Sequence, residues 1–498
     1  MPAQTPIPPR CATGVDGLDS ILAGGLPGHR FYLVQGDPGV GKTTLGLQFL
    51  LKGLQAGERG LYITLSETYE ELQEVAHSHE WDLESLAVFE LSAIEEHLAA
   101  ESQNTLFHPA EVELNQISKV LMEEVVRVQP ARVVFDSLSE LRLLAQNPLR
   151  YRRQLLALKQ FFSGRKCTVL VMDDRTSEAS DREVQSIAHG VLRLEQMAPA
   201  YGAARRRLSV VKVRGAEFRG GYHDYIIRSG GITVFPRLVA APKEEAFTTQ
   251  VASSGIEPLD SLTDGGLDRG TSNLFMGPPG TGKSTLAAQF AVAAAMRGER
   301  VAVFTFDEKI ETYIGRCDAL GMKLSQQIED GMVQAVQINP AELSPGEFTH
   351  RIRRAVEREN VRMVIIDSLN GYLNAMPEER ALTIQMHELL SYLAQRGVVT
   401  ILALAQHGLV GAMQSPVDVT YLADTVVVLR YFEVEGAVKQ AISVIKKRSG
   451  NHERTIREFQ IRRDGIHVGA PLKEFHGVLT GVPTYKGLAN EMMGNGSA

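Results

Sequence analysis

The sequence predicts an α/β protein with two tandem domains, each a mostly parallel, twisted sheet flanked by helices and followed by antiparallel strands. Two observations lead to this prediction. The octapeptide GDPGVGKT at 36–43 returns as GPPGTGKS at 277–284. Around both copies, short β-branched runs alternate with longer helical patterns, which is typical of parallel strands joined by helices.

Each octapeptide is a phosphate-binding loop of the GxxxxGK[ST] type. It follows an apolar run, 31–35 or 273–276, and precedes a helix-like run, 45–54 or 286–296. Glycines let successive backbone N–H groups converge on phosphate oxygens, and the helix N-terminus adds partial positive charge. Two plain glycine-rich turns are the alternative, but the full pattern occurs twice in the expected context. The residues predicted to bind nucleotide are Gly36, Asp37, Pro38, Gly39, Val40, Gly41, Lys42, Thr43 and Thr44, and Gly277, Pro278, Pro279, Gly280, Thr281, Gly282, Lys283, Ser284 and Thr285.

The loop side chains predict ATP and Mg²⁺ as the bound species. Lys42 and Lys283 are expected to reach the β- and γ-phosphates, and the hydroxyls of Thr43 and Ser284 are expected to coordinate the magnesium ion. Gln406 follows the apolar strand VTILALA and is a candidate sensor of the γ-phosphate. A polar loop residue without that role is an equal alternative.

Acidic residues end several of the predicted strands. Asp136 in VVFDS and Asp367 in VIIDS are predicted to hold the same magnesium ion, although an aspartate at such a turn can also cap a helix. Glu67 in LSET, and Asp307 with Glu308 in FDEK, are candidates to orient the water that attacks the γ-phosphate. Their alternative is a solvated strand end.

The duplication extends well beyond the loops. A constant offset of 241 residues, the difference between Lys283 and Lys42, aligns TGVDGLDSILAGGLPGHR with SGIEPLDSLTDGGLDRGT. Between the copies, residues 237–250 mix proline, charge and threonine without a clear pattern, as expected of a linker. The predicted parts are an N-terminal extension at 1–11, a first domain at 12–240, a linker at 241–251, a second domain at 252–485 and a short tail at 486–498.

Composition limits the expected binding partners and the expected cellular location of the protein. The chain has 498 residues with a net charge of −7, which gives no overall attraction to nucleic acid. No apolar stretch approaches the length of a membrane span, and the N-terminus lacks the apolar core of a secretory signal. The three cysteines are far apart and odd in number, so no disulfide framework is expected. We therefore expect a cytoplasmic protein with no membrane and no nucleic-acid partner.

The chain resembles the KaiC family of tandem RecA-like ATPases over roughly residues 13–485. The resemblance rests on GGLPGHR before the first loop, EWDL at Glu80, and RSGNHERTIREFQI from Arg448. It implies two RecA-like domains and a double-ringed homohexamer with ATP at the subunit interfaces. It also implies slow ATPase activity in the N-terminal ring, and autokinase and autophosphatase activity in the C-terminal ring.

The same resemblance implies that basic residues reach the nucleotide of a neighbouring subunit. Lys446, Arg448 and His452 in KKRSGNH match the family pattern KxRGxxH, and Lys212 with Arg214 match it in KVRGAEF. Such cations are suited to stabilise charge that develops on phosphoryl oxygens.

Several positions depart from the family pattern. Ser66 stands where the first of two adjacent glutamates is expected, so the usual base of the N-terminal ring is in doubt and Glu67 is the remaining candidate. Asp307 replaces the corresponding glutamate of the second half. Phe218 occupies the position of an interface histidine. The segment VTYLADT places Thr420 and Tyr421 where clock-type relatives have a Ser–Thr phosphorylation pair.

The leading hypothesis is a hexameric ATPase that signals, with Thr420 as a candidate phosphoacceptor for serine/threonine autokinase activity in the second half. The alternative for Thr420 is a plain strand hydroxyl, since β-branched residues favour strands. Its signalling partner is unknown, and the short tail after Tyr485 gives no basis for inferring a circadian role. Two other function classes stay open. One is a RecA-like, DNA-dependent ATPase, and the other is a scaffold that ATP holds together with little turnover.

Overall fold

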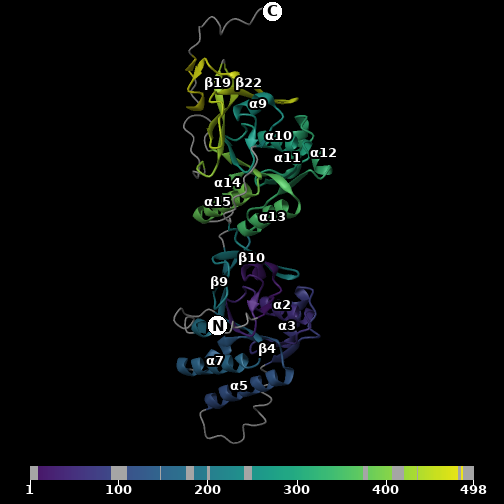
Figure 1. Cartoon of the computed structure of the whole chain (residues 1–498), viewed down its shortest axis with the longest axis vertical. Coiled ribbons are helices and arrows are strands. Elements are labelled where there is room, and N and C mark those ends of the chain that lie inside the picture. The colour runs from purple at the N-terminus through teal and green to yellow at the C-terminus, as the bar shows by residue number, and fades with distance from the viewer. Residues whose placement is uncertain are drawn as a thin grey trace, which may run out of the picture. The chain divides into compact units, whose positions relative to one another are not determined.

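A computed structural model describes residues 9–90, 109–145, 147–174, 184–198, 202–239, 250–373, 379–406, 420–434, 436–480 and 484–485. The chain divides into two compact units, Met1–Arg237 and Leu238–Ala498. Figure 1 shows helices packed around a central sheet in each unit.

The first unit contains one large sheet and a small two-stranded one. Its strands are β1 (Arg10–Cys11), β2 (Leu26–Pro27), β3 (Phe31–Gln35), β4 (Gly60–Thr64), β5 (Ala87–Glu90), β6 (Arg132–Asp136), β7 (Thr168–Asp173), β8 (Gly190–Met197), β9 (Arg205–Val213), β10 (Tyr222–Arg228) and β11 (Gly231–Phe235). Its helices are α1 (Asp16–Ile21), α2 (Lys42–Gln55), α3 (Tyr69–Ser78), α5 (Pro109–Val128), α6 (Leu138–Ala145) and α7 (Pro148–Ser163).

The second unit repeats this plan. Its strands are β12 (Val251–Ala252), β13 (Leu267–Asp268), β14 (Ser272–Gly277), β15 (Arg300–Thr305), β16 (Val333–Gln337), β17 (Val361–Asp367), β18 (Val399–Ala405), β19 (Thr425–Val434), β20 (Ala437–Lys447), β21 (Arg457–Arg462), β22 (Gly465–Pro471), β23 (Phe475–His476) and β24 (Thr484–Tyr485). Its helices are α9 (Glu257–Leu262), α10 (Lys283–Met296), α11 (Ile310–Ala319), α12 (Leu324–Glu329), α13 (Pro345–Arg358), α14 (Leu369–Leu373), α15 (Glu379–Gln395) and the 3₁₀ turn η1 (Val478–Thr480).

The two large sheets have the same topology. Within the described residues, the strand order is β11-β10-β9-β8-β3-β7-β6-β4-β5 in the first unit and β22-β21-β20-β19-β14-β18-β17-β15-β16 in the second, read from the corresponding edge. The strands from β8 to β5 and from β19 to β16 pair in parallel, and the last strands of each unit pair antiparallel. This arrangement confirms the predicted fold class.

Both faces of each sheet are buried, because successive side chains of a strand point to opposite faces. On β3, Tyr32 and Val34 join the core beneath α1, α2 and α3. Phe31 and Leu33 join the core beneath α5, α6 and α7. A strand covered on both sides must be apolar throughout, as these β3 residues are. The phosphate loop therefore begins directly after a strand that is packed on both faces.

Local capping signals begin several helices. The Thr68 hydroxyl accepts from the Glu71 N–H at 3.2 Å, and the Glu71 carboxylate accepts from the Thr68 N–H at 2.8 Å. This reciprocal pair satisfies two N–H groups that the first turn of α3 would otherwise leave unbonded. At α13, Ser344 accepts from the Glu347 N–H at 3.1 Å and Pro345 follows it, a combination that favours a helix start.

Candidate functional site

The two phosphate loops have matching backbone shapes. Gly41 and Gly282 precede α2 and α10 with a φ of 93° each, in the left-handed region. A Cβ atom at either glycine would lie 2.5 Å from the Cδ1 atom of Ile227 or Ile461, respectively. Only glycine meets both the conformational and the steric requirement. Each glycine thus leads directly into a helix whose first N–H groups have no partner within the helix and can bind an anion.

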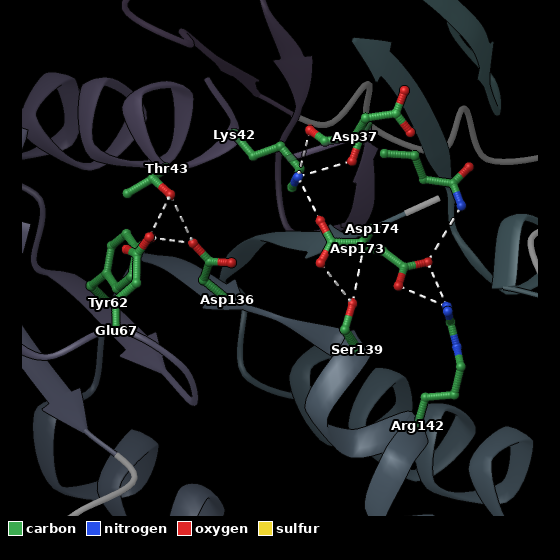
Figure 2. Close-up of polar contacts among 12 residues, drawn as sticks. Asp37, Lys42, Thr43, Tyr62, Glu67, Asp136, Ser139, Arg142, Asp173 and Asp174 are labelled. Atoms are coloured by element: carbon green, nitrogen blue, oxygen red, sulfur yellow. Dashed lines mark hydrogen bonds and ion pairs between the residues drawn. The ribbon is translucent and has the colours of Figure 1, made fainter. Parts of the chain in front are cut away.

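Lys42 lies folded over the first loop. Its Nζ donates to the carbonyl oxygens of Gly36 at 2.9 Å and Asp37 at 3.1 Å, and it forms an ion pair with Asp174 Oδ1 at 2.7 Å. Figure 2 shows these contacts around the ammonium group. The predicted phosphate-binding lysine thus points across the loop, and a carboxylate from the end of β7 meets it there.

Thr43, Asp136 and Glu67 converge beside the first loop. The Thr43 hydroxyl lies 3.3 Å from Asp136 Oδ2 and 3.5 Å from Glu67 Oε1. Tyr62, from the neighbouring strand β4, donates its hydroxyl to Asp136 Oδ2 at 2.6 Å. Figure 2 shows the four side chains facing one another. Their oxygen atoms form a polar centre within an otherwise apolar part of the unit.

Burial dominates the electrostatics of this centre. Burial raises the pKa of the Asp136 carboxyl above its ordinary value, although the Tyr62 hydroxyl and the charge of Lys42 act in the opposite direction. Burial, and then the charge of Asp136, raise the pKa of Glu67 as well. Glu67 Oε2 is buried and has no hydrogen-bond partner among the described residues. A water molecule bound at the site could therefore donate a hydrogen bond to this oxygen.

A second pair of acids follows β7. Asp173 is fully buried, and its two carboxylate oxygens contact Arg142 Nη2 at 2.7 and 2.9 Å. Asp174 contacts Lys42 through Oδ1, and its Oδ2 accepts from the Ser139 hydroxyl at 3.2 Å. Through Asp174, Lys42 of the first loop is connected to Ser139 of α6 (Figure 2).

Lys283 of the second loop is in a different environment. Its Nζ donates to the Pro278 carbonyl oxygen at 2.7 Å, and its side chain is buried. No carboxylate of the described residues lies within ion-pair distance of it. Burial lowers the pKa of Lys283 to about 8, with only partial opposition from the charge of Asp367. The second loop therefore presents a desolvated lysine, whereas the first presents a paired one.

The second centre has the predicted hydroxyl and aspartate. Burial raises the pKa of Asp367, and its hydrogen bond with Ser284 opposes that shift. Asp307 accepts a hydrogen bond from Ser368, which follows Asp367 directly. The peptide bonds Asp136–Ser137 and Asp367–Ser368 are both cis. The strand end thus brings Asp307 close to the metal-binding candidate Asp367.

Glu308 does not match Glu67 in its contacts, although the two residues align. Its Oε2 forms an ion pair with Arg316 Nη2 at 2.7 Å, and Arg316 Nη1 donates to Thr285 Oγ1 at 2.7 Å. The arginine thereby joins the acidic strand end to the loop helix. Gln406, the candidate sensor, is buried, its N–H donates to the Gly277 carbonyl at 3.0 Å, and its Oε1 has no partner among the described residues.

The predicted neighbour-facing cations contact carbonyl oxygens of their own unit. Lys446 Nζ donates to the carbonyls of Thr420 at 2.9 Å and Ala423 at 2.7 Å, and Arg448 Nη2 donates to Tyr421 at 2.9 Å. The candidate acceptor Thr420 thus begins a segment held by both cations.

The first unit repeats this pattern near its own cations. Lys212 donates to the Gln185 carbonyl, and Arg214 Nη2 donates to the Ser186 carbonyl at 2.8 Å. His452 is half-buried, in the segment after β20.

The oxygen donors at both centres fit a magnesium ion. Mg²⁺ prefers carboxylate and hydroxyl oxygens together with phosphate oxygens. Thr43 with Asp136, and Ser284 with Asp367, supply such oxygens in direct contact with each other. The raised pKa of each buried aspartate reflects a desolvated anion, which a nearby cation would stabilise.

Several residues of the centres were not predicted from sequence. Asp174 and Asp173 end the apolar run TVLVMDD, the same signal that identified Asp136, so they could have been found. Tyr62, Arg142 and Arg316 carry no such signal, because only the fold brings them to the centres.

Among the described residues, no helix has both the length and the apolar composition that a membrane span requires.

Comparison with known proteins gives a consistent result. A family model described as "ATPase: KaiC" matches residues 11–239 and 252–473. The circadian clock protein KaiC3 of Synechocystis sp. is 26% identical over 95% of this chain and 94% of its own length. KaiC2 of the same organism is 27% identical over 92% of this chain and 81% of its own. The circadian clock oscillator protein KaiC of Parathermosynechococcus lividus is 26% identical over 96% and 88%.

Proposed function

The chain belongs to the KaiC family of ATPases, and from this we propose a slow, Mg²⁺-dependent ATPase that assembles as a homohexamer and signals through its conformation. Its second half is proposed to act also as a serine/threonine autokinase. The single observation that carries the proposal is the repeated centre, in which each half brings a loop lysine, a loop hydroxyl and a buried strand-end aspartate together.

In the first half, Lys42 and the loop N–H groups would hold the phosphates. Thr43 and Asp136 would hold the metal ion, which, when bound, supplies positive charge that offsets the charge on the phosphate oxygens. Glu67 would orient the attacking water and accept its proton, because its Oε2 has no hydrogen-bond partner in the described part of the chain and its raised pKa makes it a better base than an exposed glutamate.

In the second half, Lys283 would gain a phosphate partner that its buried ammonium lacks. Ser284 and Asp367 would hold the metal ion. Asp307 is the proposed base, because Glu308 pairs with Arg316, whereas Asp307 accepts, among the described residues, only from a serine hydroxyl that can rotate. For the kinase step, Asp307 would accept the proton of the Thr420 hydroxyl as that oxygen attacks the γ-phosphate and the bond from the γ-phosphorus to the departing ADP breaks.

The hexamer would complete each site with cations from a neighbouring subunit. Lys446, Arg448 and His452 are proposed for the second ring, and Lys212 with Arg214 for the first. The carbonyl oxygens that these cations contact, and the Asp424 carboxylate 3.5 Å from Arg448, are partners that the oxygens of a phosphate could replace. We place the protein in the cytoplasm, because Cys11, Cys167 and Cys317 are all buried free thiols.

The ATPase and kinase proposals are tested with one set of purified full-length proteins. Steady-state ATP hydrolysis is measured for the parent protein, Lys42→Ala and Lys283→Ala, each of which should lose the contribution of one half. Transfer of radiolabel from [γ-³²P]ATP to protein is measured for the parent, Thr420→Ala and Asp307→Asn. The kinase proposal predicts loss of label in both variants, and persistent labelling in both would reject the acceptor and the base.

A scaffold role for the first half is the second candidate. It is favoured by Ser66, which is exposed and stands where the family pattern places an acid, so that Glu67 alone remains. In that case ATP would stabilise the assembly by binding rather than by turnover. A hexamer that persists after hydrolysis by the first half has been abolished would support this candidate.

A further inference from the structure

A carboxylate that follows β7 pairs with the lysine of the first phosphate loop. We propose that Asp174 occupies the place of a γ-phosphate beside Lys42 and makes the first site prefer a nucleoside diphosphate to a triphosphate. The inference rests on the proposed function, since it presumes that the loop binds nucleotide. It adds a residue that determines which nucleotide the site retains.

Asp174 is fixed in position by contacts at both carboxylate oxygens. Oδ1 lies 2.7 Å from Lys42 Nζ, and Oδ2 accepts from the Ser139 hydroxyl at 3.2 Å. Lys42 is nearly buried, with 10% of its side chain exposed, whereas Asp174 is about a third exposed at 35%. The more exposed carboxylate thus meets the nearly buried ammonium, the group that would otherwise contact a terminal phosphate (Figure 2).

The neighbouring acid does not compete for Lys42. Asp173 is fully buried, and Arg142 contacts both of its carboxylate oxygens. The positive charge of Arg142 is thus matched by Asp173, and that of Lys42 by Asp174. A triphosphate would add negative charge to a loop whose lysine is already neutralised, and it would need either to displace Asp174 or to lie next to it.

The second half provides an internal comparison. In the parallel ladders, Gln35 pairs with Asp173 and its counterpart Met276 pairs with Leu404. The residue after Asp173 therefore corresponds to Ala405, which has no charge. Lys283 has no carboxylate within ion-pair distance in the described part of the second unit. A carboxylate at this position therefore occurs in the first unit and not in the second, although the two units share one topology.

A diphosphate avoids most of the conflict. Its terminal phosphate is the β-phosphate, which the loop N–H groups can bind without displacing Asp174 from Lys42. The γ-phosphate of a triphosphate brings additional negative charge to within a few ångströms of the Asp174 carboxylate. At such distances, inside a partly buried site, like charges repel strongly. We expect the first site to bind ADP roughly tenfold to a hundredfold more tightly than ATP, by this Coulomb estimate.

The test uses the full-length protein carrying Lys283→Ala, so that the first loop dominates nucleotide binding. Dissociation constants for Mg-ADP and Mg-ATPγS, a slowly hydrolysed triphosphate, are measured by calorimetry. They are compared in this background, in Asp174→Asn, and in the control Asp82→Asn. Asp82 is exposed and accepts only from the Glu84 N–H among the described residues, a bond that asparagine can also accept. Asp174→Asn should remove the preference for ADP, and Asp82→Asn should leave it.

The outcomes separate this inference from the proposed function. If ADP and ATPγS both bind and their affinity ratio is close to one with Asp174 present, or is unchanged by Asp174→Asn, the inference is overturned while nucleotide binding stands. If neither nucleotide binds to the Lys283→Ala protein or to its Asp174→Asn form, the proposed function of the first loop fails as well. A preference for ADP that disappears only in Asp174→Asn supports the inference.

Discussion

At the residue scale, two lysines in equivalent positions have opposite electrostatic surroundings. Lys42 has a carboxylate partner, whereas Lys283 is buried against a carbonyl oxygen and its pKa is lowered to about 8. The sequence identifies both as phosphate-loop lysines but does not distinguish their electrostatic surroundings. The difference arises from Asp174, which lies 132 positions after Lys42 in the chain and which only the folded sheet brings to the loop.

The lowered pKa of Lys283 predicts a pH dependence of nucleotide binding. In the free protein the ammonium loses its proton near pH 8, and bound phosphates favour the charged form, so the pKa of Lys283 is higher in the complex. Affinity for ATP at the second site should therefore be constant below about pH 8 and fall above it, by up to about tenfold per pH unit. Binding is measured from pH 6.5 to 9.5 in a Lys42→Ala background.

The matched control is Lys283→Arg, whose guanidinium keeps its charge throughout this range. If this variant binds ATP, its affinity should not decline with pH. An equal affinity of the Lys283 protein at pH 7 and pH 9 would contradict the proposed desolvated lysine.

Glu67 gives the second residue-scale prediction. Glu67→Gln, in a Lys283→Ala background, should lower ATP turnover about 100-fold or more while nucleotide binding persists, because a general base is removed but the phosphate contacts remain. Since the pKa of Glu67 is raised, ATP turnover by the protein with Glu67 intact should decline on acidification. The decline should begin at a higher pH than it would if Glu67 had the pKa of an ordinary glutamate.

The readouts for this prediction are steady-state hydrolysis and its pH profile. Glu84→Gln serves as the control, since Glu84 is an exposed acid outside both centres. Unaltered turnover in Glu67→Gln would remove Glu67 from the mechanism.

At the element scale, repeated motifs and alternating hydrophobicity predicted the strands that deliver the loops. The apolar run before each loop is a central parallel strand, β3 or β14. The acids that end apolar runs lie at the carboxyl ends of parallel strands. The connection of α6 to β7 through Arg142 and Asp173 was not predictable, because an arginine in a helical sequence gives no indication of a buried partner. Sequence therefore predicted the elements and the loops more completely than the contacts between them.

The Arg142–Asp173 pair predicts a stability effect. Arg142→Met leaves the fully buried Asp173 without its ion-pair partner, and breaking such a pair typically costs about 3–5 kcal/mol. The double variant Arg142→Met with Asp173→Leu should recover much of this loss, because the second unit has Leu404 at the corresponding position of its ladder. Unfolding in urea is followed by the fluorescence of Trp81.

Trp81 suits this measurement because it is the chain's one tryptophan and packs against the core of the first unit. Its signal therefore reports that unit. Lys119→Met, which breaks an ion pair with Glu123 whose two side chains are 68% and 65% exposed, should leave the unfolding midpoint unchanged. Equal midpoints for the parent, the single and the double variant would show that the buried pair contributes nothing to stability.

At the scale of the whole molecule, the duplication explains why one chain has two chemically related but unequal centres. The proposed hexamer would place each centre at a subunit interface. Native mass spectrometry with Mg²⁺ and ATPγS should then give six times the mass of the chain, and the Lys42→Ala, Lys283→Ala double variant should dissociate, because nucleotide binding favours the assembled state. A chain that stays monomeric with nucleotide bound would contradict the assembly.

The central claim is that each half binds one nucleotide through its own phosphate loop, and counting bound nucleotide tests it most directly. The protein is incubated with Mg²⁺ and ATP, separated from free ligand and denatured, and the released ATP and ADP are quantified together. The account predicts two nucleotides per chain for the parent, one for each of Lys42→Ala and Lys283→Ala, and none for the double variant. A parent protein that retains no nucleotide, or single variants that retain two, would contradict it.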